Sequence, residues 1–351
     1  MELNLLSSDQ VDALNRLIDG AENIVLVCHA RPDGDSLGSA LGWAEYLTTV
    51  RKKKTAIVAP NAFPDFLQWL PGSERVVRYD KHADEVVKMF KRAQLVCCMD
   101  FNAYERVDEM TPVLQQCDAP IVMIDHHPSP TLPCSVSISE PELCSTSEVI
   151  FRVVWQLGGF ELLTKKFAVP VYCGMMTDTG GFTYNSTRPE IYFIICQLLT
   201  KKIDKDKIYR NVFNNFSSWA IRLRGYLMSQ KLNVFPEQHA TFYSISREEM
   251  SNFHFVRGDV EGLVNEPLRI KGIRMSISLR EDDRADNRVW VSLRSVDNFS
   301  VEDIAKRFFN GGGHLNASGG RLDCSLQEAE KVAREAVAYF GRQFLPQEPN
   351  A

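Results

Sequence analysis

Residues 24–42 read IVLVCHARPDGDSLGSALG, and this stretch indicates the fold class of the N-terminal half. Its first five residues form an uninterrupted apolar run, which is typical of a strand covered on both faces of a sheet. One histidine, two aspartates and a glycine-containing helical pattern follow directly. Acidic side chains in this place either cap the next helix or contribute one half of a metal site, and the stretch alone leaves both readings open.

Strands and helices alternate along the rest of this half. Four more apolar runs are expected to be strands, namely TAIVAP (55–60), RVVRY (75–79), LVCCM (95–99) and IVMI (121–124). A helical region is expected to begin at Ser145, and the apolar segment VPVYCGMM (169–176) is expected to end at the same sheet edge as the strands. The alternation predicts an α/β fold in which helices flank a parallel sheet.

The pattern changes after residue 200, where a charged helical segment precedes runs that alternate between apolar and polar residues. The runs GIRMSISLRED and RVWVSLRSV meet at EDDRADN, whose composition indicates a hairpin loop. We therefore expect an α/β domain over residues 1–195, a helical linker over 196–230 and a smaller mixed α+β domain over 231–345.

The net charge and the cysteines exclude several classes of protein. A formal charge of −5 over 351 residues provides no bulk field for binding nucleic acid. The nine cysteines form no CxxC pair, which disfavours a zinc–thiolate site and indicates free thiols in a reducing cytoplasm. No apolar run approaches the length of a membrane span, and the N-terminus lacks the pattern of a secretory signal.

Acidic residues and histidines gather where the predicted strands end, which is where open α/β sheets bind ligands. His29, Asp33 and Asp35 follow the first run, Asp100 follows LVCCM, Asp125, His126 and His127 follow IVMI, and Asp178 follows VPVYCGMM. Carboxylates that share one edge repel each other unless divalent cations neutralise them. This ligand set suits Mn²⁺ or Mg²⁺, and its size favours two ions that share one carboxylate. Taken singly, such an aspartate is more simply explained as a helix cap.

The second half contributes the segment FFNGGGHLNASGGRL (308–322). Its consecutive glycines, Gly311, Gly312 and Gly313, allow backbone N–H groups to form an anion-binding nest beside His314. Arg294 lies in the strand pattern WVSLRSV and would fit a phosphate next to that nest. A plain glycine-rich turn and an outward-facing arginine on an edge strand are the alternatives.

Five motifs resemble those of the DHH phosphoesterase family in its two-domain form, which carries a DHH-associated C-terminal domain. They are HARPDGDSLGS (29–39), MDFN (99–102), IDHHPS (124–129), MTDTGGF (176–182) and GGGHLNASGG (311–320). The chain departs from the family pattern twice. Ser318 follows Ala317 where two alanines are usual, and Asn310 stands where a fourth glycine is common.

The resemblance implies a role for each site residue. One ion would be bound by His29, Asp33 and Asp100, and the other by Asp35, Asp100, His126 and Asp178, with Mn²⁺ favoured over Mg²⁺ or Co²⁺. Asp100 would bridge the ions, and the water between them would be the nucleophile. Asp125 would orient a histidine ring, and His127 would face the substrate phosphate or the leaving oxygen. Substrate would be bound by His127, Arg294, Gly311, Gly312, Gly313 and His314.

The implied activity is two-metal hydrolysis of short oligonucleotides (nanoRNA, pApA) and of 3′-phosphoadenosine 5′-phosphate, as in the bifunctional oligoribonuclease and phosphatase type of the family. The alternatives are a cyclic di-AMP phosphodiesterase, an exopolyphosphatase or pyrophosphatase, and a non-catalytic nucleotide sensor. A sensor would be expected to lose a metal carboxylate, whereas all four are present here. The expected partner is a short single-stranded oligonucleotide or a nucleotide, and a homodimer is left open.

Overall fold

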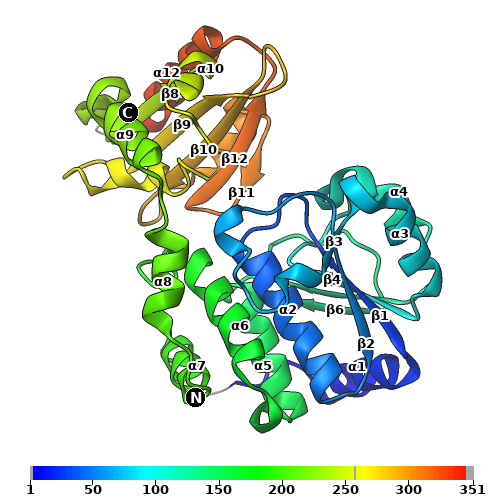
Figure 1. Cartoon of the computed structure of the whole chain (residues 1–351). Helices are drawn as coiled ribbons and strands as arrows, with labels where there is room; N and C mark the ends of the chain where they lie inside the picture. Colours follow the sequence, from blue (N-terminus) through cyan, green and yellow to red (C-terminus); the bar gives the residue numbers. More distant parts are fainter. Residues whose placement is uncertain (1–2, 257, 345–351) are drawn as a thin grey trace, which may run out of the picture. The chain divides into compact units, whose positions relative to one another are not determined.

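The computed structural model describes residues 3–256 and 258–344, and the chain divides into two compact units. The first unit covers residues 1–215 and the second covers residues 216–351 (Figure 1). The boundary falls inside the segment predicted to be a linker, and the division into three parts stays a prediction. Among the described residues, no helix has both the length and the apolar character needed to cross a membrane.

A six-stranded sheet forms the centre of the first unit, with the strand order β3-β2-β1-β4-β5-β6. The strands are β1 (Asn23–Cys28), β2 (Lys54–Ala59), β3 (Val76–Arg78), β4 (Leu95–Met99), β5 (Ile121–Asp125) and β6 (Val136–Ser139). Every neighbouring pair is parallel, which confirms the predicted fold class. Strand β6 was not predicted, because this edge strand has only four residues and alternates between buried and more exposed positions.

The helices of the first unit are α1 (Ser8–Gly20), α2 (Gly34–Thr49), α3 (Tyr79–Arg92), α4 (Thr111–Gln115), α5 (Thr146–Leu157), α6 (Lys165–Asp178), α7 (Pro189–Thr200) and α8 (Lys205–Phe213). They cover both faces of the sheet, except that α7 packs against α5 and α6, and α8 packs against α6. Alternate residues of β1 belong to two different cores. Ile24 and Leu26 pack in the core that contains α2, α5 and α6, whereas Val25 and Val27 pack in the core that contains α3 and α4. This double burial explains why the run is apolar throughout.

The segment VPVYCGMM ends beside the expected edge of the sheet, but it does so as part of a helix. It lies inside α6, and Asp178, the last residue of that helix, contacts His126. The helix buries most of its residues, including Phe167, Val171 and Met175. Because a helix buried on most sides loses its amphipathic period, its apolar run resembles that of a buried strand.

Three glycines let α2 approach α6 closely. Gly34, Gly38 and Gly42 lie one turn apart on α2 and face Thr177, Pro170 and Val171 of α6 in that order. A Cβ atom on Gly38 would lie 2.5 Å from the carbonyl oxygen of Pro170, and one on Gly34 would clash with the Thr177 side chain. The two helices run in opposite directions, so the beginning of α2 and the end of α6 lie together.

The second unit is built on a mixed sheet with the strand order β11-β12-β10-β9-β8-β7. Its strands are β7 (Asn233–Phe235), β8 (Ala240–Ile245), β9 (Met275–Glu281), β10 (Val289–Ser295), β11 (Gly312–Gly313) and β12 (Ala317–Leu322). Its helices are α9 (Ser218–Tyr226), α10 (Arg247–Asn252), α11 (Glu302–Phe308) and α12 (Leu326–Gly341). Strands β8 and β9 pair in parallel, and the other pairs are antiparallel. The hairpin at EDDRADN is confirmed, since it connects β9 to β10.

Candidate metal centre

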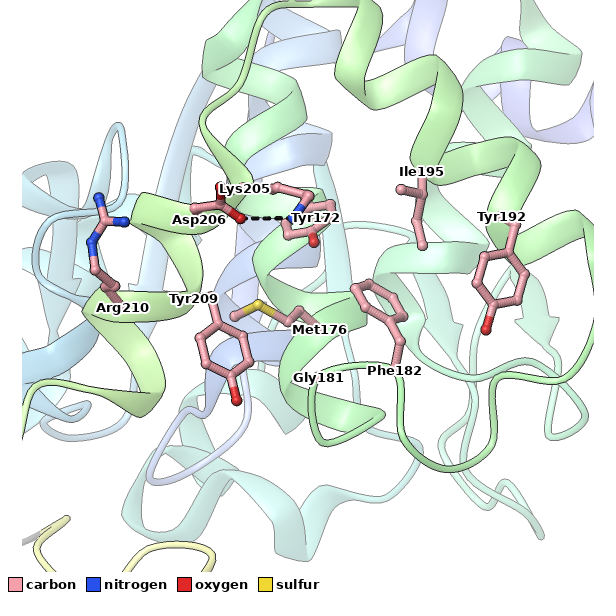
Figure 2. A pocket seen from close by; sticks show the side chains of 10 residues that line it. All are labelled: Tyr172, Met176, Gly181, Phe182, Tyr192, Ile195, Lys205, Asp206, Tyr209 and Arg210. Carbon is pink, nitrogen blue, oxygen red and sulfur yellow. Dashed lines mark hydrogen bonds and ion pairs between the residues drawn. The ribbon is translucent and has the colours of Figure 1, made fainter.

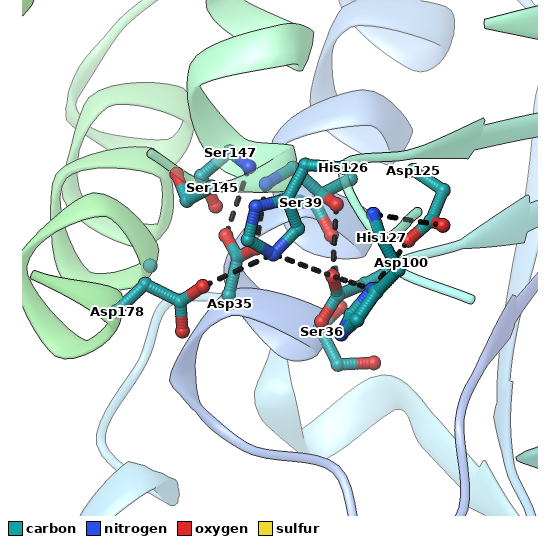
Figure 3. A network of polar contacts seen from close by, with 12 residues as sticks. Asp35, Ser36, Ser39, Asp100, Asp125, His126, His127, Ser145, Ser147 and Asp178 are labelled. Carbon is teal, nitrogen blue, oxygen red and sulfur yellow. Dashed lines mark hydrogen bonds and ion pairs between the residues drawn. The ribbon is translucent and has the colours of Figure 1, made fainter. Parts of the chain in front are cut away.

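Side chains from five segments of the first unit meet at the carboxyl ends of β1, β4 and β5 (Figure 3). His29 follows β1, Asp33 caps α2, Asp35 lies in the first turn of α2, Asp100 follows β4, Asp125 ends β5 and precedes His126 and His127, and Asp178 ends α6. The structure therefore brings together all six residues predicted to bind metal. Asp178 reaches the group from a helix, through the close packing of α2 against α6, and not from a strand end.

Asp100 is common to three groups of candidate ligands in the first unit. These groups are His29–Asp33–Asp100, Asp35–Asp100–His126 and Asp100–Asp125–His127, and the ligand atoms of each group lie within 4.8 Å of one another. The Asp100 side chain is only 2 % exposed. A buried carboxylate with candidate ligands on both sides is the arrangement that a bridging ligand requires.

Two histidines present the same ring nitrogen to the carboxylates. Nδ1 of His29 lies 2.9 Å from the carbonyl oxygen of Ala30, and Nδ1 of His126 lies 3.2 Å from that of Leu143. A carbonyl oxygen can only accept a hydrogen bond, so each Nδ1 is a donor and each Nε2 is the atom that can bind a cation. Nε2 of His29 lies 3.4 Å from Asp100 Oδ2, and Nε2 of His126 lies 3.2 Å from Asp178 Oδ2.

Asp125 contacts the third histidine. One of its carboxylate oxygens lies 2.7 Å from His127 Nδ1, and the other accepts a hydrogen bond from the backbone N–H of His127. Asn102 fastens the same loop, because its side-chain amide donates to the carbonyl oxygens of His127 and Pro128. The ring of His127 is thus held by its Nδ1 side. The motif MDFN contains Asn102, whose role the sequence analysis did not assign.

The beginning of α5 hydrogen-bonds to two of the carboxylates. The helix start at Ser145 was expected, but these contacts were not. The backbone N–H groups of Thr146 and Ser147 donate to Asp35, and the Thr146 hydroxyl donates to Asp100. The signal lies in the segment STSE (145–148), where the Ser145 side chain caps the helix by accepting from the Glu148 N–H. Such a pattern marks a helix N-terminus, whose unpaired N–H groups favour a carboxylate.

The charges of the cluster are strongly coupled. Burial opposes the charged ring of His29, but the hydrogen bonds and charges of Asp100 and Asp33 outweigh it and raise the pKa of His29 to about 10. Burial raises the pKa of Asp178 to about 6, although its hydrogen bond with His126 acts in the other direction. Burial and the charges of Asp100 and Asp178 raise the pKa of Asp35 well above its usual range. Without cations this cluster retains protons that cations would displace.

The remaining predicted site residues belong to the second unit. Arg294 lies on β10 between β9 and β12, so it is not on an edge strand. Its Nε atom is buried and has no hydrogen-bond partner among the described residues. Gly312 and Gly313 pair with β12, and a Cβ atom on Gly311 would clash with the backbone at Gly319. Gly311 and Gly313 therefore allow the backbone to approach β12 closely, whatever the segment binds.

The two departures from the family pattern have local explanations. Asn310 has a φ of +48°, a left-handed conformation that asparagine accepts more readily than most residues. The Ser318 hydroxyl donates to the carbonyl oxygen of His314 over 2.9 Å. Both substitutions are thus compatible with the loop.

A pocket of about 470 Å³ lies elsewhere in the first unit, between α6, α7 and α8 (Figure 2). Its lining residues are Tyr172, Met176, Gly181, Phe182, Tyr192, Ile195, Lys205, Asp206, Tyr209 and Arg210, and none of them is a predicted site residue. Lys205 is paired with Asp206, and Figure 2 shows Arg210 extending away from the aromatic rings. This concave surface and the carboxylate cluster are therefore separate features.

Comparison with known proteins agrees with the motifs. The model of the DHH family N-terminal domain matches residues 23–175, and the model of the DHHA1 domain matches residues 250–340. A solved structure described as an exopolyphosphatase-related protein from Bacteroides fragilis is 43 % identical, covers 96 % of this chain and 98 % of its own, and superposes with a TM-score of 0.91.

The chain belongs to the DHH family. Among its relatives, the bifunctional oligoribonuclease and PAP phosphatase NrnA of Thermus thermophilus is 28 % identical, over 90 % of this chain and 89 % of that protein. The NrnA of Bacillus subtilis is 26 % identical over 91 % of this chain and 95 % of that protein. An exonuclease RecJ bound to manganese shares the fold, with a TM-score of 0.53 and 14 % identity. As a DHH family phosphoesterase, the chain is a hydrolase.

Proposed function

We propose that this DHH family protein is a two-metal phosphoesterase that hydrolyses short oligonucleotides, such as nanoRNA and pApA, and 3′-phosphoadenosine 5′-phosphate. The observation that carries the proposal is the position of Asp100. Its carboxylate lies within 4.8 Å of candidate ligand atoms of His29 and Asp33, and also of those of Asp35 and His126. NrnA relatives named for both activities match about nine tenths of the chain, and this likeness supports the choice of substrates.

The donor set of the cluster fits two divalent cations. His29, Asp33 and Asp100 would bind one ion, and Asp35, Asp100, His126 and Asp178 would bind the other. The fit rests on histidines whose Nε2 atoms face carboxylates and on buried acids whose mutual repulsion cations would relieve. Such ions would activate water and offset the negative charge of the phosphate. Mn²⁺ is the cation that we favour, because it accepts both imidazole nitrogen and carboxylate oxygen.

His127 and Asp125 would assist at the leaving oxygen. Asp125 accepts a hydrogen bond from Nδ1 of His127, so Nε2 is the ring nitrogen that would face a substrate oxygen. His127 would act as hydrogen-bond donor or general acid in its imidazolium form, in which both ring nitrogens carry a proton. Asp125 would orient the ring and stabilise its positive charge.

The C-terminal residues 231–345 would bind the far end of the substrate, and residues 1–195 would carry the catalytic site. Arg294, Gly311, Gly312, Gly313 and His314 are the residues that we assign to this binding. The buried Nε atom of Arg294 has no hydrogen-bond partner in the part of the chain that the structure describes. This supports the assignment, because a phosphate oxygen would satisfy it.

Exopolyphosphatase activity is the second candidate. The observation that favours it is the likeness to the Bacteroides fragilis protein, which is described as exopolyphosphatase-related and is 43 % identical to this chain. A polyphosphate chain would present negatively charged phosphate groups to the metal cluster, as a nucleotide does, but would have no nucleobase.

A substrate panel distinguishes these activities. Purified protein with Mn²⁺ would be given 3′-phosphoadenosine 5′-phosphate, pApA, cyclic di-AMP, RNAs of two to five nucleotides and polyphosphate, with Asp100→Asn as the inactive control. We expect the highest kcat/KM for pApA, short RNA or 3′-phosphoadenosine 5′-phosphate. Faster release of phosphate from polyphosphate would support the second candidate. Tight nucleotide binding without turnover of any substrate would show a sensor and contradict the proposal.

A further inference from the structure

Thr146 hydrogen-bonds to two carboxylates of the cluster at once. Its backbone N–H donates to Asp35 Oδ2 over 2.6 Å, and its hydroxyl donates to Asp100 Oδ1 over 2.8 Å. A backbone N–H can only donate, and the ionised carboxylate of Asp100 can only accept, so threonine is the donor in both bonds. The Thr146 side chain is fully buried, which excludes water from competition for these oxygens.

Asp100 is a residue whose orientation needs such a contact. Its φ of +65° lies in the left-handed region, and its side chain extends between the three histidines of the cluster. Oδ2 lies 3.4 Å from His29 Nε2, whereas Oδ1 lies 3.7 Å from both His126 Nε2 and His127 Nδ1. Rotation of the carboxylate would change which oxygen faces which histidine. The Thr146 hydroxyl occupies one lone pair of Oδ1 and leaves the other lone pairs of the carboxylate for further ligands.

The position of Thr146 is itself fixed by α5. Ser145 caps the helix by accepting from the Glu148 N–H over 3.0 Å. The buried Glu148 carboxylate in turn accepts from the Cys144 N–H and forms ion pairs with Arg152 and Arg188. The start of α5 is therefore fixed by the Ser145 cap and by the contacts of Glu148. Thr146 has little freedom to follow a displaced carboxylate.

We propose that Thr146 is a positioning residue of the metal centre, which holds Asp100 and Asp35 in the relative orientation that two cations require. This inference rests on the proposed function, since it assumes that cations bind in the cluster. Partners that orient metal ligands commonly change metal affinity about 10-fold to 100-fold when they are removed. We expect a loss of this size when the hydroxyl is removed.

Metal titration of the full chain tests the proposal without any substrate. Metal-free wild type, Thr146→Val and Thr146→Ser would be titrated with Mn²⁺ by calorimetry, and the melting temperature of each metal-free protein would be recorded. We expect Thr146→Val to bind at least one Mn²⁺ about 10-fold more weakly and Thr146→Ser to stay within about 3-fold of wild type. The matched control is Thr241→Val, since Thr241 is a buried threonine of the second unit whose hydroxyl donates to the Met275 carbonyl.

Three outcomes would overturn the proposal. The first is a folded Thr146→Val protein whose Kd for Mn²⁺ lies within 3-fold of the wild-type Kd. The second is an equal loss in Thr146→Ser, which would show that side-chain shape matters and not the hydroxyl. The third is an equal loss in Thr241→Val. If Thr146→Val does not fold, Thr146→Ala provides the same comparison. Wild type that binds no Mn²⁺ would instead refute the proposed function itself, together with this inference.

Discussion

At the scale of the residue, Asp100 combines a left-handed backbone with a buried carboxylate that faces three histidines. If this carboxylate bridges two ions, its removal should affect both ions, because a neighbouring ligand could compensate for only one. Variants of Asp100 test metal binding, and variants of Arg294 test substrate binding.

Asp100→Ala is expected to lose both ions and nearly all activity, because the same carboxylate serves both ligand groups. Metal content by elemental analysis and kcat measured with saturating Mn²⁺ check this outcome. The control is Asp84→Ala, an exposed aspartate on α3 that should keep two ions. An Asp100→Ala protein that retains two ions would contradict the bridging role.

Arg294→Ala is expected to raise KM about 10-fold or more and to leave the metal content unchanged, because a charge-assisted hydrogen bond to phosphate is worth about 1.5–3 kcal/mol. Arg321→Ala is the control, since this arginine lies on the neighbouring β12 and is about half exposed. Wild-type KM in the Arg294 variant would remove this residue from the substrate site.

At the scale of the element, the contact between α2 and α6 depends on residues without a side chain. It brings Asp35 and Asp178 together from helices that are far apart in the sequence. The β9–β10 hairpin offers a second element whose stability depends on one buried carboxylate, that of Asp282.

Gly38→Ala is expected to lower the free energy of unfolding by about 1–3 kcal/mol and to weaken Mn²⁺ binding, since the added methyl group would push α6 away from α2. Urea unfolding and Mn²⁺ titration measure the two effects. Gly20→Ala is the control, because a Cβ atom there meets nothing within 4 Å. Equal stability of the two variants would show that the helices adjust without cost.

Asp282 predicts acid sensitivity of the hairpin. Burial raises its pKa, but hydrogen bonds from the N–H groups of Ala285 and Arg284 and from the Trp290 indole outweigh burial and lower this pKa to about 2. Because the pKa of Asp282 is lower in the folded state, its ionised carboxylate stabilises the fold at pH values above the unfolded pKa of 3.8. This stabilisation is lost as the pH falls toward 2. The stability difference between wild type and Asp282→Asn should therefore be constant above about pH 5 and shrink between pH 4 and pH 2. A difference that does not change over this range would contradict the assignment.

At the scale of the whole molecule, the six candidate metal ligands all belong to the first unit, whereas Arg294 and the glycine segment belong to the second. Ligand binding stabilises only the state that binds it. The two units should therefore respond differently to the removal of metal.

Removal of metal by EDTA is expected to lower the unfolding temperature of the first unit and to leave that of the second unchanged. A cation at 100 times its Kd contributes about 2.7 kcal/mol to the unit that binds it. Differential scanning calorimetry of the full chain, with transitions assigned through Gly38→Ala and Asp282→Asn, measures both. A loss of stability confined to the second unit would contradict the placement of the ions.

The amino-acid sequence by itself determined the α/β class, five of the six parallel strands and the convergence of His29, Asp100 and His126. These features follow from local apolar runs and from the rule that ligands gather where parallel strands end. The tertiary structure alone decided that VPVYCGMM is a helix, because burial on most sides removes the period that distinguishes it from a strand. It also decided that Thr146 holds Asp35 and Asp100, which lie 111 and 46 residues away, since no local pattern encodes contacts over such separations.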